Sequence, residues 1–430
     1  MKSSMIKKRM AMKKKQICLA FASLLLVCAM TVNMTGCSVQ VQAKDLMEGI
    51  IPHAASVLDD LDPQNAAVTD FAVRLFQASE EGGKNTLISP LSVLCALAMT
   101  ANGAKGQTLV QTESVLGMTV EELNRYLYSY RKNLPTGEKY KLSLANSVWF
   151  TKDTRFTVNQ DFLQTNADYY GADIYKAPFD DQTCRDINNW IKAKTDGRIP
   201  EILDEIPDSA VMYLVNALAF EAEWSKIYKE NQVRDGQFTK EDGTKQDAEF
   251  MYGTEGTYLE DEQATGFIKY YKGGKYAFVA LLPNKGVRVS DYIASLDGKS
   301  LNALLSDPQH ATVNTAIPKF ETEFAVEMSE ALAEMGMPDA FDAYKADFSG
   351  LGTSSAGNIF INRVLHKTFI SVGEKGTKAG AATVVEANDE GAAVILEPKE
   401  VYLDRPFVYL LVDCENNIPF FIGTMMDIEK

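Results

Sequence analysis

The stretch Gly373-Glu374-Lys375-Gly376-Thr377-Lys378-Ala379-Gly380-Ala381-Ala382-Thr383 decides how the rest of this 430-residue sequence is interpreted. Successive side chains of an extended backbone point to opposite faces. One face from Thr377 onward is therefore small and uncharged, consisting of Thr377, Ala379, Ala381, Thr383, Val385 and Ala387. Glycine and alanine are poor strand formers. The pattern predicts a segment that fits a sheet but is weakly held in it, with a Gly/Ala-rich surface loop as the alternative.

The first 36 residues carry an export signal, because seven basic residues precede an apolar run over 17–34. The run ends in Met34-Thr35-Gly36-Cys37, which resembles the lipobox of bacterial lipoproteins. That resemblance implies a bacterial protein and makes Cys37 its lipid anchor; an ordinary signal peptide with an incidental Cys37 is the alternative. We expect a signal peptide at 1–36, a tether at 37–60 and a folded body at 61–430, located on the extracellular face of the cell membrane or secreted.

The composition of the exported chain excludes several classes of function. Without residues 1–36, 36 basic residues face 58 acidic ones, a net charge of −22, so nucleic acid is not an expected partner. The cysteines that remain after Cys37 are Cys95, Cys184 and Cys414, which do not form a disulfide framework. The three histidines lack metal-ligand spacing, so we expect no metal site.

Helical and strand patterns follow one another after residue 60 without a clean domain boundary. Helices are expected over 108–116, 121–133, 160–169, 186–194 and 326–335. Strands are expected over 140–150, 211–220, 311–320, 359–372, 401–413 and 418–425, with a hairpin at Gly273-Gly274. Helices concentrate early and strands late, which favours one interwoven α+β body over βαβ units.

Signatures of catalysis are sparse. The sequence has no Gly-x-Ser-x-Gly elbow and no His-Glu-x-x-His motif. Ser129 and Lys132 fit the Ser-x-x-Lys motif of the penicillin-recognising enzymes, but the companion Ser-Asp-Asn and Lys-Thr-Gly motifs are missing. An acyl-serine enzyme that uses Ser129 and Lys132 is therefore kept only as a minor hypothesis.

Several separated motifs resemble the serpin family of serine protease inhibitors, from about residue 65 to residue 430. They occur in the family's order at 85–93, 187–199, 215–224, 317–320, 346–350, 404–407 and 420–423. The resemblance implies a serpin fold: a large central sheet, further sheets, surrounding helices and an exposed reactive loop. It places the "shutter" under the main sheet at Ser89, Ser92, Asn216 and His366. We also expect His366 to be buried and hydrogen-bonded.

The opening stretch matches the family's hinge, which is the most specific of these motifs. The resemblance assigns hinge positions to Glu374, Gly376, Thr377, Ala379, Ala381 and Thr383. It also places the "breach" at Trp224, Lys319 and Glu374, with an ion pair between the last two. In serpins a protease cleaves the exposed loop, which then inserts as a new strand and traps the acylated protease. Because an unpaired charge buried on insertion is costly, the uncharged face favours an inhibitor.

The resemblance thus implies a monomeric suicide-substrate inhibitor rather than an enzyme, without a cofactor and attached to the membrane only through its N-terminal lipid. A non-inhibitory binding protein on the same fold is the alternative. Counting from the hinge places the reactive bond between Glu390 and Gly391, after Asp389, which suits a protease that accepts an acidic residue. Counting backward from 405–407 places it later, at Ala392, Ala393 or Val394. Elastase-like, subtilisin-like and glutamate-specific proteases are the candidate targets.

Overall fold

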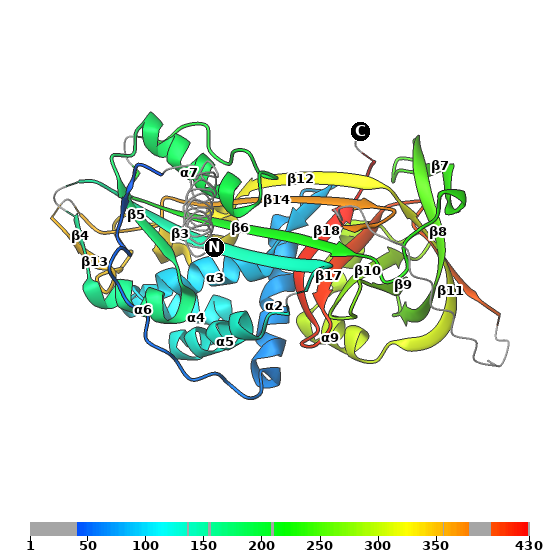
Figure 1. The fold of residues 1–430 in the computed structure, drawn as a ribbon, viewed down its shortest axis with the longest axis horizontal. Helices are drawn as coiled ribbons and strands as arrows, with labels where there is room; N and C mark the ends of the chain where they lie inside the picture. Colours follow the sequence, from blue (N-terminus) through cyan, green and yellow to red (C-terminus); the bar gives the residue numbers. More distant parts are fainter. Residues whose placement is uncertain are drawn as a thin grey trace, which may run out of the picture. The chain divides into compact units, whose positions relative to one another are not determined.

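A computed structural model describes residues 41–135, 137–153, 156–207, 210–355, 357–377 and 397–428. Helices dominate the first half of these residues and strands the second half (Figure 1). The α+β class predicted from the sequence is therefore confirmed. No helix in the described part of the chain is long and apolar enough to cross a membrane. The predicted signal peptide and Cys37 lie outside the described residues.

The central sheet has the strand order β1-β5-β3-β6-β15-β14-β12 in the described part of the chain. Its strands are β1 (Lys44–Asp45), β3 (Tyr140–Thr151), β5 (Asp173–Ala177), β6 (Met212–Glu223), β12 (Phe320–Glu327), β14 (Arg363–Gly373) and β15 (Gly376–Thr377). β6 lies in the interior of the sheet, next to β3 on one side and to β14 and β15 on the other (Figure 1). Its apolar run fits this place because a strand that is covered on both faces needs apolar side chains on both.

A second sheet has the order β16-β11-β8-β9-β10-β17-β18-β2, with β7 paired to β8. Its strands are β2 (Thr86–Ile88), β7 (Val233–Thr239), β8 (Lys245–Glu260), β9 (Ala264–Tyr270), β10 (Tyr276–Pro283), β11 (Gln309–Pro318), β16 (Lys399–Tyr402), β17 (Phe407–Asp413) and β18 (Ile418–Met425). A separate pair joins β4 (Phe156–Val158) to β13 (Gly352–Ser354). Gly273 and Gly274 both have positive φ and turn the chain from β9 to β10, so the predicted hairpin is confirmed.

The helices pack around these sheets. They are α2 (Asp62–Ser79), α3 (Pro90–Ala101), α4 (Gly106–Leu116), α5 (Val120–Asn133), α6 (Gln160–Tyr170), α7 (Asp181–Lys194), α8 (Val289–Ser295), α9 (Gly298–Ser306) and α10 (Ser329–Glu334), with 3₁₀ turns at Glu230–Gln232 and Pro338–Phe341. α3 is buried along its whole length. Pro90 starts this helix directly after the extended Ser89, a position where the missing N–H of proline costs nothing.

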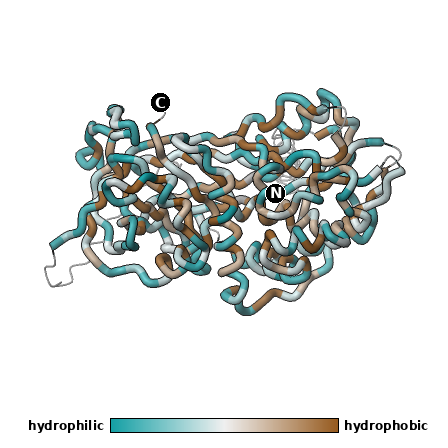
Figure 2. The backbone as a smooth tube through the Cα atoms, turned by 180° about the vertical axis from the view of Figure 1, so that it is seen from behind, coloured by the Kyte–Doolittle hydropathy of each residue, from teal (hydrophilic) through white to brown (hydrophobic). Residues whose placement is uncertain are grey.

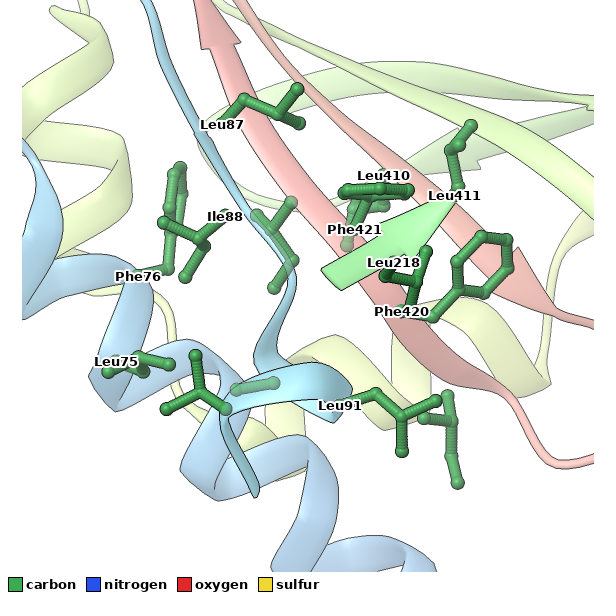
Figure 3. Packing of buried hydrophobic residues seen from close by; sticks show 14 of the residues in the cluster. Leu75, Phe76, Leu87, Ile88, Leu91, Leu218, Leu410, Leu411, Phe420 and Phe421 are labelled. Carbon is green, nitrogen blue, oxygen red and sulfur yellow. The ribbon is translucent and has the colours of Figure 1, made fainter. Parts of the chain in front are cut away.

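The main core joins the early helices to both sheets. Figure 3 shows side chains of α2, β2 and α3 beside those of β6, β17 and β18: Leu75, Phe76, Leu87, Ile88, Leu91, Leu218, Leu410, Leu411, Phe420 and Phe421. Each such side chain contributes roughly 1.5–3 kcal/mol when it is fully buried. Figure 2 shows hydrophilic segments along the outer loops and hydrophobic ones within the body. This core packs β2 and α3 against the central sheet.

Two sequence predictions of secondary structure were wrong in detail, and two short helices were missed. The helix expected over 326–335 begins only at Ser329, because β12 continues to Glu327 with alternating buried and exposed residues. The strand expected over 401–413 is two strands, β16 and β17, separated around Pro406, which cannot donate a ladder hydrogen bond. The short helices α8 and α9 were not predicted, since 7 and 9 residues are too few for a clear helical period.

β12 forms one outer edge of the central sheet. It pairs with β14 on its inner side through all eight residues. Its exposed positions include Glu321, Glu323 and Glu327, and Lys367 of β14 pairs with Glu323 at 2.6 Å. The outer edge of the sheet is thus a short strand that carries repeated acidic side chains.

Candidate functional site

The predicted hinge enters the central sheet. Gly376 and Thr377 form β15, which pairs antiparallel with β14 on one side and with β6 on the other. Gly376 lies opposite Gly373 and Glu223, and Thr377 lies opposite Val372 and Ala222. The chain that follows Gly373 therefore turns back between two strands that are parallel to each other. The hinge positions Ala379, Ala381 and Thr383, and the reactive-bond candidates Asp389, Glu390, Gly391, Ala392, Ala393 and Val394, lie outside the described residues.

We call the space between β6 and β14 that β15 enters the slot. Two contacts fix the hinge in this slot. Gly376 has φ = 146°, and a Cβ added there would collide with the Ala222 carbonyl oxygen, so only glycine fits. Thr377 is buried, and its hydroxyl forms a hydrogen bond with the Tyr271 hydroxyl. Burial raises the pKa of Tyr271, which therefore stays protonated and able to donate.

Trp224 and Tyr228 hold the residues that precede β15. The Trp224 indole Nε1 donates to the Gly373 carbonyl at 2.8 Å. The backbone N–H of Trp224 donates to the Lys375 carbonyl at 2.8 Å, and that of Tyr228 donates to the Glu374 carbonyl at 2.9 Å. Three successive hinge carbonyls are thus satisfied by one short segment of chain.

Trp224 is also fixed from the other side. Its ring is buried and stacks on Tyr271, with centroids 4.4 Å apart and planes 10° apart. The same Tyr271 bonds Thr377, so the tryptophan and the hinge share one supporting side chain.

The ion pair predicted between Lys319 and Glu374 is present. Lys319 Nζ lies 2.8 Å from Glu374 Oε1 and 3.0 Å from Glu249 Oε2. The hydrogen bond from Lys319 holds the pKa of Glu374 below its ordinary value, and the same bond raises the pKa of Lys319. The two side chains are 30% and 39% exposed, so water screens much of their attraction.

The four predicted shutter residues meet where β14 pairs directly with β6, and all four are buried. His366 of β14 accepts a hydrogen bond at Nε2 from the Ser89 N–H at 3.0 Å. The imidazole Nδ1 lies 2.7 Å from Asn216 Oδ1, and the Ser92 hydroxyl donates to the same oxygen at 3.0 Å. The histidine thus joins β14 to β6 and to the junction of β2 with α3.

The hydrogen bonds of His366 define its protonation state. Because Nε2 accepts from a backbone N–H, the proton of the neutral ring lies on Nδ1 and is donated to Asn216. A second proton on Nε2 would break the bond to Ser89. Burial lowers the pKa of His366 from 6.5 to about 3, so the ring is neutral at physiological pH.

Hinge and shutter lie at the two ends of the interface between β6 and β14. At the shutter end, residues 363–366 of β14 pair in parallel with residues 213–216 of β6. At the hinge end, β15 lies between the two strands. In the described part of the chain, no ladder pairing joins 217–221 of β6 to 367–371 of β14. The interface between these strands is therefore only partly closed by direct pairing.

The chain with this central sheet resembles known proteins in both sequence and structure. A family model described as "Serpin (serine protease inhibitor)" matches residues 66–428. The chain belongs to the serpin family. The leukocyte elastase inhibitor of the horse, Equus caballus, is 30% identical to this serpin over 369 residues, which span 82% of this chain and 96% of that protein.

Solved structures also match this serpin. The thermophilic serpin tengpin in its native state is 46% identical, with a TM-score of 0.86 over 90% of this chain and all of that one. Tengpin in its latent state is 43% identical, with a TM-score of 0.77 over 88% of this chain and all of that one. The predicted serpin fold is therefore confirmed.

Sequence reasoning missed three residues of the site: Tyr228, Lys269 and Tyr271. Lys269 and Tyr271 share one face of the β9 region with Phe267, and all three side chains are buried. A lysine that alternates with aromatic residues in this way is a signal of an inward-facing charge.

The Ser-x-x-Lys motif lies apart from this site, on α5. Ser129 is buried, and its hydroxyl accepts from the Leu58 N–H at 2.8 Å and donates to the Arg125 carbonyl at 2.7 Å. Lys132 Nζ lies 5.5 Å from the centroid of the Tyr128 ring. A hydroxyl that is used in two structural hydrogen bonds is poorly placed to act as a nucleophile.

Proposed function

We propose that this serpin is a suicide-substrate inhibitor of serine proteases that traps the acyl-enzyme by inserting its cleaved loop into the central sheet. The observation that carries the proposal is the antiparallel pairing of Gly376 and Thr377 with both β6 and β14. The residues that precede the loop thus already run in the direction an inserted strand needs.

Two further observations support trapping. The interface between β6 and β14 has few direct pairs, so a strand that enters there replaces only the pairs at 363–366 and gains partners on both sides. From Thr377 to Ala387, the side chains that insertion would bury in the alternating pattern are all uncharged. The similarity to a leukocyte elastase inhibitor points in the same direction.

For the target, we propose a protease of the elastase-like, subtilisin-like or glutamate-specific type. Cleavage between Glu390 and Gly391 favours the last type, and cleavage near Ala392, Ala393 or Val394 favours the first. Mass spectrometry of the fragment released from an inhibited protease identifies the bond directly.

The test of trapping is a panel of these three protease types mixed with the exported chain at equal molar ratio. We expect a complex with at least one of them that survives denaturing electrophoresis. Thr377→Arg, which places a charge at a buried position, should abolish the complex and leave only cleaved inhibitor. Lys375→Arg, at an exposed neighbouring position, is the matched control and should trap normally. Cleavage by all three proteases without a stable complex would instead favour a non-inhibitory binding protein.

We further propose that the serpin is a monomer anchored by lipidated Cys37 on the extracellular face of a bacterial membrane. Expression with a labelled fatty acid should label the wild-type protein and leave Cys37→Ala unlabelled. If the wild type carries no label, the ordinary signal peptide is the better interpretation.

A further inference from the structure

Lys269 of β9 places a charged group in the interior of the site. Its side chain is 2% exposed, and Nζ lies 2.7 Å from Glu255 Oε1 of β8. The same ammonium donates to the Lys226 carbonyl at 3.3 Å. A lysine is rarely buried to this extent unless it is paired, so its position asks for an explanation.

The ammonium of Lys269 also lies over two aromatic rings. Nζ is 5.2 Å from the centroid of Trp224 and 4.4 Å from that of Tyr228. Both distances are within the range of a cation–π interaction, which is stronger where water is excluded. Together with the bond to Lys226, three of the five residues from Trp224 to Tyr228 contact one ammonium group.

The segment from Trp224 to Tyr228 is the one that holds the hinge. Its two backbone N–H groups and one indole N–H donate to the carbonyls of Gly373, Glu374 and Lys375 at 2.8–2.9 Å. A continuous chain of contacts therefore runs from Glu255 through Lys269 to these two aromatic residues and on to the hinge.

Stability alone does not explain the buried pair. Removing two charges from water costs free energy that their attraction often fails to recover, and apolar residues of similar size are frequently as stable. Apolar residues in place of Lys269 and Glu255 could not attract the two rings and the carbonyl of Lys226, as the ammonium does. The geometry is thus better suited to positioning than to stabilisation.

We propose that Lys269 is a positioning residue that holds the 224–228 segment, and through it the hinge, in the orientation from which the loop enters the sheet. The proposal rests on the trapping function proposed above. When Lys269 releases the two rings, the hinge carbonyls lose their ordered donors. The first step of strand entry then becomes slower relative to hydrolysis of the acyl-enzyme.

The test compares the wild type with Lys269→Met/Glu255→Gln, which removes both charges and keeps the side-chain sizes close. Hydrogen exchange should be at least tenfold faster at the amides of Trp224 and Tyr228, while the amides of β3 stay unchanged. The matched control is Lys275→Met/Glu415→Gln, which makes the same substitutions in an ion pair whose side chains are 48% and 60% exposed. Unchanged exchange at Trp224 and Tyr228 would overturn the proposal.

A milder pair of variants tests the same contact in case the double variant does not fold. Tyr228→Leu removes one ring and leaves the ion pair, so the Tyr228 position should lose protection. Tyr228→Phe keeps the ring and should retain it. Equal protection in these two variants contradicts a role for the ring.

Inhibition gives the second readout. More molecules of Lys269→Met/Glu255→Gln than of the wild type should be cleaved for each protease trapped, by threefold or more. If the wild type traps no protease, the proposed function fails while the exchange experiment still decides the role of Lys269. If exchange changes but the cleavage ratio does not, Lys269 orders the hinge without affecting entry, and the proposal is overturned.

Discussion

Acidification should lower the unfolding free energy of the protein through His366, at the shutter end of the interface between β6 and β14. The ring is neutral in the folded protein with a pKa of about 3, against an ordinary value of 6.5. The unfolded chain therefore binds one more proton than the folded chain between these values, and stability falls as the pH drops below 6.5. At pH 5 the 1.5-unit gap below the ordinary value corresponds to about 2 kcal/mol of lost unfolding free energy, at 1.36 kcal/mol per unit.

The assay is urea unfolding of the native form at pH 7 and pH 5. The wild type and His366→Gln are compared because all other titrating groups are common to both. The variant should be less stable at pH 7, since it loses the exact geometry between Ser89 and Asn216. Its loss on going to pH 5 should be smaller than that of the wild type by about 2 kcal/mol. His310→Gln, at an exposed ring, should behave like the wild type. Equal losses in wild type and His366→Gln would refute the reasoning.

Three further predictions concern the hinge and the residues that hold it. In a double-mutant cycle of Lys319→Met and Glu374→Gln, thermal unfolding should give a coupling of about 0.5–1 kcal/mol at neutral pH, because both groups are partly exposed. The coupling should disappear as the pH falls through the lowered pKa of Glu374, and a coupling that persists in acid would contradict the ion pair. Gly376→Ala should expel the hinge, seen as faster hydrogen exchange at Thr377, and unchanged exchange would show that the slot can accept a methyl group. Trp224→Phe should lower the urea unfolding free energy by about 1 kcal/mol or more through loss of the indole donor, whereas an unchanged value would mean that the donor is replaced.

The sequence alone predicted those parts of the structure that depend on local pattern. The apolar run of β6 and the glycine pair between β9 and β10 carry their own signals, and both are found as expected. The grouping of Ser89, Asn216 and His366 came from the family resemblance, because no local pattern links residues that lie more than 100 positions apart.

The parts that were missed depend on tertiary contacts. β12 carries apolar residues that fit both a strand and a helix, and its pairing with β14 decides between them. The alternation around Lys269 indicates an inward-facing lysine, but only the pairing of β8 with β9 shows that Glu255 is its partner. Residues 41–60, expected as a tether, lie partly against the body, since β1 pairs with β5 and the Leu58 N–H donates to Ser129.

The outer edge of the central sheet bears on how copies of this protein behave at high concentration. Among the described residues no strand pairs with the outer edge of β12, so a second β12 could add to its backbone groups. Such pairing would bring the side chains of Glu321, Glu323 and Glu327 opposite those of the other copy, and like charges on facing strands repel. Edge-to-edge aggregation through β12 is therefore disfavoured by repulsion between these acidic side chains.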